Sequence, residues 1–356
     1  TVGIGINKNI YSEMYNISYM NPYATRDAVS LGYNVFFRET DYGEFNVANY
    51  LTNSNGFGAQ FGYPISDISR LGFNITYDKT DIDIGTLPAR EIYDFVSVEG
   101  NIFETLTAQL SWQQVTLNRG LFPTDGASTV VSFSSTIPGS DLSYYRFNIR
   151  QRYYQPLSSD FVFGFQGEIG YLDSYGDTEE IPFFQNFYAG GPRSLRGFES
   201  NTLGPRSTDA PCYEFNYEEG TCPNLIDTDG DGEADAPYLN PYANQGQRSR
   251  YRDAPIGGNI KVEGSLQLIF RLPFIEDQRS LRSAFFFDFG NVFSDNCKEY
   301  QINCSELSVD ELRYSYGVGV TWITGFGPMS LAIAKPTNAG PLERTEEFQF
   351  TVGNVF

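Results

Sequence analysis

The chain has 356 residues, of which 16% are aromatic, and its formal net charge is −20, with 44 acidic against 24 basic residues. This balance disfavours nucleic-acid binding, which needs a basic face that replaces counterions. The sequence contains no histidine, which excludes a Ser-His-Asp hydrolase and a His-ligated metal site.

Apolar runs in this sequence are short. None approaches the roughly eighteen residues of a transmembrane helix, so no such helix is expected. The length would ordinarily suggest two or more domains, although barrels exceed that norm as one unit. We therefore expect one domain over 1–356, with a long loop inserted at 172–258. Because Thr1 opens directly on a strand-like pattern, we expect a mature or N-terminally trimmed chain without a targeting peptide.

Apolar and polar residues alternate at every second position through most of the chain. The alternating segments run for about ten residues and are broken by Gly, Pro, Asn and Asp. Segments 71–77 and 161–171 are typical, with small or polar residues between the apolar ones. In the segment 28–38 the apolar positions are Val29, Leu31, Tyr33, Val35 and Phe37. This pattern is typical of transmembrane β-strands, which are apolar toward lipid and polar toward the lumen.

A soluble β-sandwich is the alternative, since its strands also alternate, but they are usually only about five or six residues long. In this chain, charged residues share the polar face in mid-strand, namely Arg146, Arg150 and Arg152 on one strand and Glu263 and Arg271 on another. A packed core does not accept that many charges, whereas a wet lumen does. The sequence therefore predicts an all-β fold, an antiparallel transmembrane β-barrel.

The pattern predicts 14 strands, an even number, as in closed bacterial barrels. Their expected ranges are 1–8, 11–20, 28–38, 57–64, 69–78, 104–113, 127–137, 143–154, 160–171, 259–271, 282–293, 311–323, 328–336 and 347–356. Short turns at 21–23, 63–64, 156–157 and 272–273 are assigned to the periplasmic rim. Longer polar segments are assigned to the outer rim, at 79–103, 172–258 and 294–310.

The four cysteines form two close pairs, Cys212 with Cys222 and Cys297 with Cys304, both in expected outer loops. An even count in short local spacings favours disulfides in an oxidising compartment. A zinc site with four cysteine ligands is the alternative, although neither pair has the tight spacing of zinc ligands. We expect both local disulfides.

The long loop also contains an acidic run with oxygen ligands spaced as in a calcium-binding loop, at Asp227, Asp229, Asp231 and Asp235. Tyr238 stands where an EF-hand has its bidentate glutamate. Two interpretations stay open, a weak calcium site and a solvated acidic loop tip. No other cofactor is expected.

The chain closes on an alternating aromatic segment, 347–356. Its apolar positions Phe348, Phe350 and Val352, with a final Phe356, describe a last lipid-facing strand. They also resemble the sorting signal that outer-membrane barrels present to their assembly machinery. Gly353 lies near the end of this strand, where glycine either weakens strand pairing or simply finishes the strand.

Several motifs together resemble one family. The most specific is Leu195-Arg196-Gly197-Phe198 in the long loop, preceded by the glycine- and aromatic-rich segment 186–191. The others, in chain order, are Leu121-Phe-Pro-Thr-Asp-Gly126, Ile137-Pro-Gly-Ser-Asp141, Phe287-Asp-Phe-Gly290, Phe326-Gly-Pro328 and Glu347-Phe-Gln-Phe350. They cover essentially the whole chain and resemble the BamA family, the central component of the bacterial β-barrel assembly machine.

The resemblance implies that the long outer loop folds back into the lumen, where Arg196 pairs with acidic side chains of the barrel wall. One partner would be Asp288, which the alternation also places on the inner face. The family's second acidic partner would fall at Gln267, which carries no charge, so Glu263 on the same face is expected to substitute. The loop would then act as an internal strut, and a ligand site is not expected there.

The chain also departs from the family. Members of the family carry soluble periplasmic repeat domains before a barrel of sixteen strands, and we expect that those domains and the first two strands are missing here. In the family, the terminal strand meets the first strand at a lateral seam that opens to pair with incoming strands, which is β-augmentation. A barrel of 14 strands would either close or stay open.

The function implied by the resemblance is non-enzymatic. The chain would fold and insert outer-membrane proteins in a Gram-negative bacterium, with lipid, lipopolysaccharide, unfolded barrel substrates and lipoprotein subunits as partners. The alternatives are a passive porin, a related protein-secretion barrel, and an outer-membrane lipase, which the missing histidine disfavours.

Overall fold

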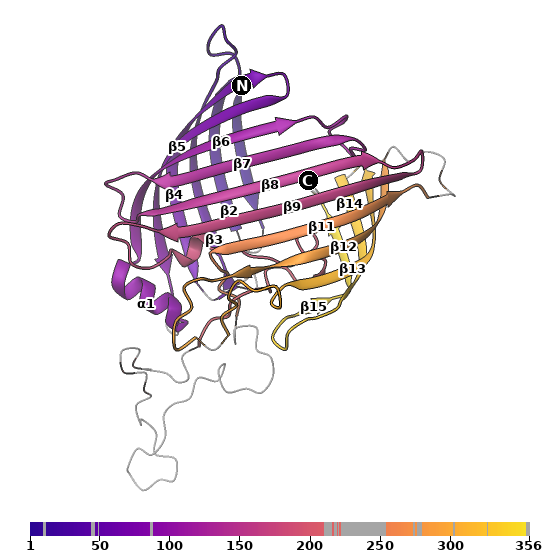
Figure 1. Ribbon diagram of the computed structural model, residues 1–356. Coiled ribbons are helices and arrows are strands. Elements are labelled where there is room, and N and C mark those ends of the chain that lie inside the picture. The colour runs from indigo at the N-terminus through magenta and orange to yellow at the C-terminus, as the bar shows by residue number, and fades with distance from the viewer. Residues whose placement is uncertain are drawn as a thin grey trace.

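One curved antiparallel sheet makes up most of the molecule (Figure 1). The computed structural model describes residues 1–9, 12–43, 47–48, 50–85, 88–209, 216, 219, 221, 254–272, 275, 280–301, 303–325 and 327–353. The 14 strands of the sheet are β1 (Val2–Lys8), β2 (Ser12–Asn21), β3 (Ser30–Asp41), β4 (Leu51–Ser66), β5 (Ser69–Asp83), β6 (Ile102–Val115), β7 (Gly126–Thr136), β8 (Tyr144–Pro156), β9 (Phe161–Ser174), β11 (Ile260–Phe270), β12 (Leu281–Phe293), β13 (Arg313–Thr324), β14 (Gly327–Pro336) and β16 (Phe348–Val352). Neighbours in space are neighbours along the chain, which confirms the expected fold class and strand count.

Some expected strand ends are wrong at both rims. The expected turn at 63–64 lies inside β4, which runs on to Ser66. At the outer rim the strands are longer than expected. β4 begins at Leu51 rather than 57, and β5 runs on to Asp83 rather than 78. In these extensions the outward Lys79 and Asp81 are polar, while the inward Thr80 and Ile82 are buried. The lipid-facing pattern therefore disappears although the ladder continues, with Leu51 opposite Asp83. The segment 79–103 also contains the helix α1 (Arg90–Glu99), whose Ile92 and Phe95 are buried.

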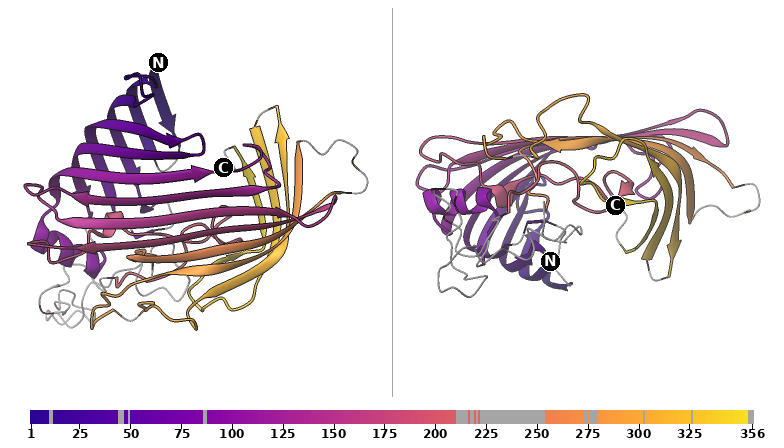
Figure 2. Two further views of the ribbon diagram at one scale, coloured as in Figure 1. Left: turned by 45° about the horizontal axis from the view of Figure 1, so that its top comes forward. Right: turned by 90° about the horizontal axis from the view of Figure 1, so that it is seen from below.

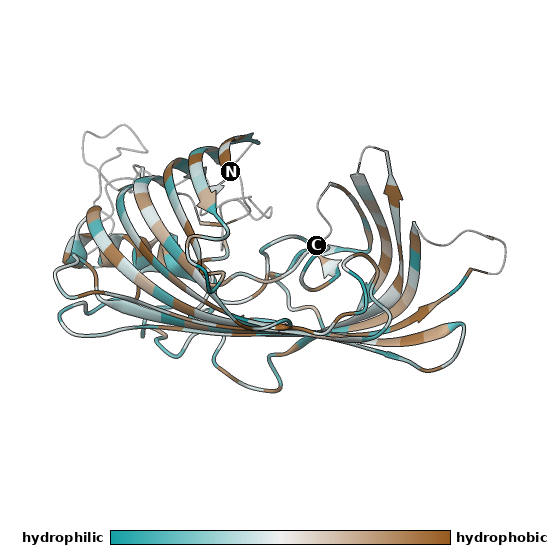
Figure 3. Ribbon diagram, turned by 90° about the horizontal axis from the view of Figure 1, so that it is seen from above, coloured by the Kyte–Doolittle hydropathy of each residue, from teal (hydrophilic) through white to brown (hydrophobic). Residues whose placement is uncertain are grey.

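The outer face of the sheet is apolar. Tyr33, Val35 and Phe37 of β3 are 50%, 60% and 41% exposed, as the alternation predicted for lipid-facing positions. Phe285 and Phe287 of β12 point the same way. Seen from above, hydrophobic and hydrophilic bands alternate along the strands (Figure 3). The apolar side chains thus form the surface that a bilayer covers.

The helices in the described ranges are all too short or too polar to cross a membrane.

β1 and β16 are the two edges of the sheet. These two strands lie at opposite margins of the curved sheet (Figure 2). Among the described residues no ladder joins them. The sequence allowed two arrangements, a closed barrel or an open sheet. The described strands form an open sheet. Within the described part of the chain, β16 pairs along one edge, with β14.

The concave side of the sheet is filled by the loop that follows β9. Its 3₁₀ turn η2 (Phe183–Gln185) and the residues after it pack inside the sheet, and Phe187 lies against Gly170 of β9. The buried cluster joins this loop to the wall and to α1; its members include Phe95, Phe103, Phe183, Phe187, Phe198, Leu142, Leu172, Leu195 and Leu203. The expected insertion of the loop into the lumen is therefore confirmed, and residues 186–200 are called the motif loop below.

A disulfide joins Cys297 to Cys304 in the loop between β12 and β13, as expected. This short ring contacts α1 in two ways. The Tyr300 hydroxyl donates to Asp94 of α1 at 2.5 Å, and the Arg90 guanidinium lies 4.0 Å from the centre of the Tyr300 ring. The cross-linked loop thus fixes α1 over the outer end of the barrel.

Replacing both Cys297 and Cys304 by serine should loosen α1. The chain-entropy model for so short a ring gives a loss of about 2 kcal/mol, confined to the outer loops because no strand depends on the ring. Hydrogen exchange of residues 90–99 should speed up while exchange in β8 stays unchanged. Equal protection of α1 in the variant and the parent protein would contradict this assignment.

Candidate functional site

Arg196 of the motif loop is held by Asp288 of β12. Its Nη2 and Nε each donate to one carboxylate oxygen at 2.7 Å, and its backbone N–H donates to the same carboxylate at 3.1 Å. The Asp288 side chain is 0% exposed and that of Arg196 is 15% exposed. A planar guanidinium fork and a carboxylate match each other with two parallel bonds, so this pair fixes both position and orientation of the loop.

Two further wall residues surround the same guanidinium. Nη2 of Arg196 also donates to Ser265 Oγ of β11 at 2.9 Å. The guanidinium lies 3.4 Å from the centre of the Phe286 ring, a cation–π contact. Ser265 stands directly opposite Asp288 in the β11–β12 ladder, so adjacent strands supply both acceptors.

The expected contact of Glu263 with Arg196 is replaced by other contacts. Glu263 accepts a hydrogen bond from Ser194 at 2.5 Å and pairs with Lys261 at 3.2 Å. The register explains this, because Glu263 lies opposite Gly290, one inward position away from Asp288. Gln267 donates to the Ser265 hydroxyl at 3.2 Å and so reaches Arg196 through a shared neighbour. A serine hydroxyl, rather than a second carboxylate, completes the arginine site.

Gly197 brings the motif loop against the wall. Its φ is +91°, and a Cβ at this position would lie 3.2 Å from Ala334 Cβ and 3.4 Å from Pro336 Cδ and Ser315 Cβ. Glycine is the residue that takes this backbone conformation without strain. The flanking Leu195 and Phe198 are 1% and 0% exposed and join the buried cluster.

The motif loop also contacts the last strand, which sequence reasoning missed. Gly197–Phe198 form β10, which pairs with β15 (Thr345–Glu346) just before β16. The side chain of Gln349 in β16 accepts from the Gly197 N–H at 3.3 Å and donates to the Phe198 carbonyl at 2.8 Å. The alternation could have indicated an inward contact here, because it places the polar Gln349 on the inner face between the lipid-facing Phe348 and Phe350.

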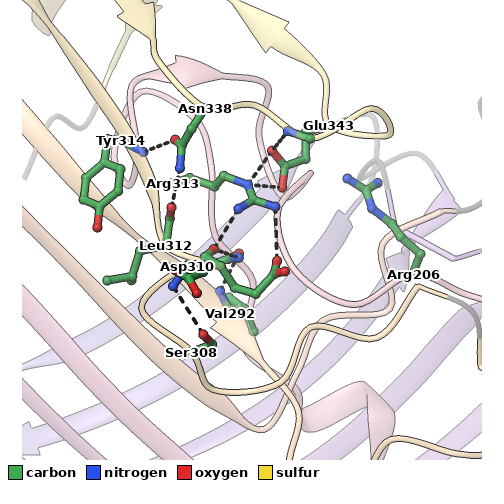
Figure 4. A network of polar contacts seen from close by, with 12 residues as sticks. Arg206, Val292, Ser308, Asp310, Leu312, Arg313, Tyr314, Asn338 and Glu343 are labelled. Carbon is green, nitrogen blue, oxygen red and sulfur yellow. Dashed lines mark hydrogen bonds and ion pairs between the residues drawn. The ribbon is translucent and has the colours of Figure 1, made fainter.

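The segment between β14 and β16 is fixed by a buried ion pair (Figure 4). Arg313 Nε donates to both oxygens of Glu343 at 2.6 and 2.8 Å. Glu343 also accepts from the Gly340 N–H at 2.7 Å, and Asn338 donates to the Leu312 carbonyl at 2.6 Å. These bonds define the path by which the chain reaches β15.

The outer side of the long loop is tied to α1 through Glu91. Its carboxylate accepts from the Thr208 hydroxyl at 2.6 Å and from the Thr208 N–H at 2.9 and 3.1 Å. Burial raises the pKa of Glu91 above its usual value, and these hydrogen bonds oppose the shift. The long loop is thus held at the lumen wall through Arg196 and at the outer end through Thr208.

A cavity of about 470 Å³ lies below the motif loop. Its lining includes Arg150, Arg152, Arg282 and Phe122, which lies between β6 and β7. The lumen is thus packed with buried side chains on one side of the motif loop and contains this cavity on the other.

The remaining predicted residues are placed as follows. Phe348, Phe350 and Val352 are exposed on the lipid side of β16, and Gly353 follows with a φ of +107°. The other residues named from the sequence lie outside the described ranges: Phe356, Cys212, Cys222, Asp227, Asp229, Asp231 and Asp235.

Comparisons with known proteins agree with this architecture. The chain is 29% identical to the outer membrane protein assembly factor BamA of Neisseria meningitidis serogroup B, over 96% of this chain and 41% of that protein. It is 24% identical to the mouse sorting and assembly machinery component 50 homolog, over 78% of this chain and 50% of that protein. It therefore spans half or less of the length of these two curated relatives.

Among solved structures, the crystal structure of BamA from Haemophilus ducreyi lacking POTRA domains 1-3 superposes with a TM-score of 0.80 and 27% identity. That match covers 99% of this chain and 63% of the solved one. The family model of the Omp85 superfamily domain matches residues 1–356. The chain belongs to the Omp85 superfamily.

Proposed function

We propose that this chain is the barrel of an outer-membrane protein assembly factor in a Gram-negative bacterium. One observation carries the proposal: the Arg196 fork on Asp288 anchors the motif loop inside a sheet that shares the BamA barrel fold over 99% of its length. The relatives named as assembly factors support the same role.

The proposed mechanism uses no covalent chemistry. β16 offers an edge, and among the described residues its ladder with β14 covers five residue pairs, Met329 with Val352 to Ile333 with Phe348. By comparison, β13 and β14 share ten pairs. A substrate strand would add to this edge by exchanging backbone hydrogen bonds, and a short edge strand would thin the bilayer beside it.

The proposed partners follow from this role. They are unfolded outer-membrane proteins as substrates, the lipid and lipopolysaccharide that cover the apolar face, and lipoprotein subunits that bind periplasmic domains preceding the barrel. Nucleic acid is not a partner, given the formal charge of −20. The porin alternative is disfavoured by the packed outer half of the lumen.

Depletion of the full-length protein tests the proposal. The amounts of many different barrel proteins in the outer membrane should fall together, and re-expression of the full-length protein should restore them. In planar bilayers the purified protein should give small, intermittent currents. Loss of a single solute uptake activity with unchanged barrel proteins, together with large steady openings, would identify a porin.

A further inference from the structure

The last strand and the motif loop are joined by a continuous set of hydrogen bonds. In the β10–β15 ladder, Gly197 pairs with Glu346 and Phe198 with Thr345. The ladder extends on one side through the Glu199 N–H, which donates to the Arg344 carbonyl at 3.0 Å. On the other side it ends at Gln349, which is 1% exposed.

Gln349 continues this ladder with its side chain. A primary amide carries one carbonyl acceptor and N–H donors, the same pair of groups that a peptide unit offers. Its Oε1 accepts from the Gly197 N–H and its Nε2 donates to the Phe198 carbonyl. The side chain therefore acts as one more rung between the motif loop and β16, in a place where an unsatisfied polar group is costly.

The motif loop is also the luminal support of β16. Its tip contacts β12 through Arg196 and β14 through Gly197, beside Ala334. β16 pairs with β14 over five residue pairs, and among the described residues its second edge has no partner strand. The bonds from Gln349 to the motif loop therefore add substantially to the few contacts that fix the position of β16.

We propose that Gln349 is a positioning residue that couples docking of the motif loop to pairing of the terminal strand. This coupling rests on the proposed function, in which that strand exchanges partners with a substrate. Because two linked equilibria affect each other equally, loosening the loop frees β16, and displacing β16 loosens the loop. Docking of the motif loop therefore changes when β16 pairs with a substrate strand.

Hydrogen exchange on the full-length protein in lipid nanodiscs tests the coupling. In Gln349→Met, which keeps the length and removes the amide, protection factors should fall by about tenfold. The fall should appear both in 197–199 and in 348–352. In Arg196→Gln, which leaves β16 untouched, the same two segments should respond together. A response in one segment alone, in either variant, would overturn the coupling.

A second variant isolates the amide itself. In Gln349→Glu the introduced carboxylate has no donor for the Phe198 carbonyl, whereas the protonated acid has a donor and an acceptor, as the amide does. Protection factors, corrected for intrinsic exchange, should be low at about pH 8 and recover near about pH 4. Because a carboxylate at this buried position is costly whatever its partners, the deciding comparison is with Gln349→Met at about pH 4. Protection in Gln349→Glu should exceed that in Gln349→Met at this pH, and equal protection in the two variants would refute the proposal.

The matched control is Gln109→Glu. Gln109 is an inward glutamine of β6, and it accepts a bond from Asn74 on the neighbouring strand at 3.2 Å. This variant should leave 197–199 and 348–352 unchanged at either pH. Assembly of a barrel substrate by the same samples separates the two claims. Coupled segments without assembly would contradict the proposed function, and assembly with uncoupled segments would contradict the coupling alone.

Discussion

Replacing Arg196 by alanine should release the motif loop from the barrel wall and remove assembly activity. The Asp288 carboxylate is 0% exposed and would lose the two Nε and Nη2 bonds that neutralise it. Stranding one member of such a pair costs about 3–5 kcal/mol. Protease cleavage within 186–200 should increase, and the variant should fail to restore barrel proteins in cells depleted of the parent protein.

The double variant Arg196→Ala, Asp288→Ala separates the pair from its members. It removes both charges, so it should be less damaging than the sum of the two single changes. Arg150→Ala is the control, because the Arg150 side chain is 54% exposed and its partner Glu168, at 15% exposure, also pairs with Lys261 at 3.3 Å. Removing Arg150 therefore leaves Glu168 paired, and the loss should be about 1 kcal/mol. If Arg196→Ala affected loop cleavage and assembly as little as Arg150→Ala does, the role of the Arg196–Asp288 pair in bracing the motif loop would be refuted.

Gly197→Val should displace the motif loop even with Arg196 intact. The change places a branched side chain at a φ of +91° and pushes atoms toward Ala334 Cβ, 3.2 Å from the position of the new Cβ. Backbone strain and overpacking together cost about 2–4 kcal/mol. The measurement is the rate of protease cleavage in the loop, with thermal unfolding of the sheet followed in parallel.

Gly327 provides the control for this change. Its φ is +112°, and a Cβ there has nothing within 4 Å. Alanine at Gly327 therefore adds the backbone strain alone, whereas alanine at Gly197 adds strain and close contact. The amount by which alanine at Gly197 increases loop cleavage more than alanine at Gly327 measures the contribution of close packing between loop and wall. Equal effects at the two glycines would show that the approach is unimportant.

The sequence predicted the sheet because its physical signal is local. A strand between lipid and water must alternate apolar and polar residues, so this pattern alone predicts β3 and β12. The helix α1 was missed, since its buried Ile92 and Phe95 lie within a segment that is polar on average. The extended ends of β4 and β5 were missed because their outward positions, such as Lys79 and Asp81, are polar and give no lipid-facing pattern.

The candidate site was only partly predictable from the sequence. Alternation placed Asp288 inward, and the family resemblance supplied Arg196 as its partner. Glu263 was chosen because it shares a face with Gln267, but a shared face does not define which residue lies opposite Asp288. Register does, and it selects Ser265. Gln349 was missed because its partners are backbone groups 152 and 151 positions away, and an inward polar position alone does not indicate which groups it contacts.

The distances along the chain between these partners bear on the order in which the molecule forms. Each hairpin of the sheet joins consecutive strands, so pairing can spread from neighbour to neighbour at small entropic cost. The motif loop is different: Arg196 bonds a residue 92 positions later, and Gly197 bonds one 152 positions later, in the final strand. Its last contact cannot form before that strand arrives, so docking of the loop marks the completion of the barrel.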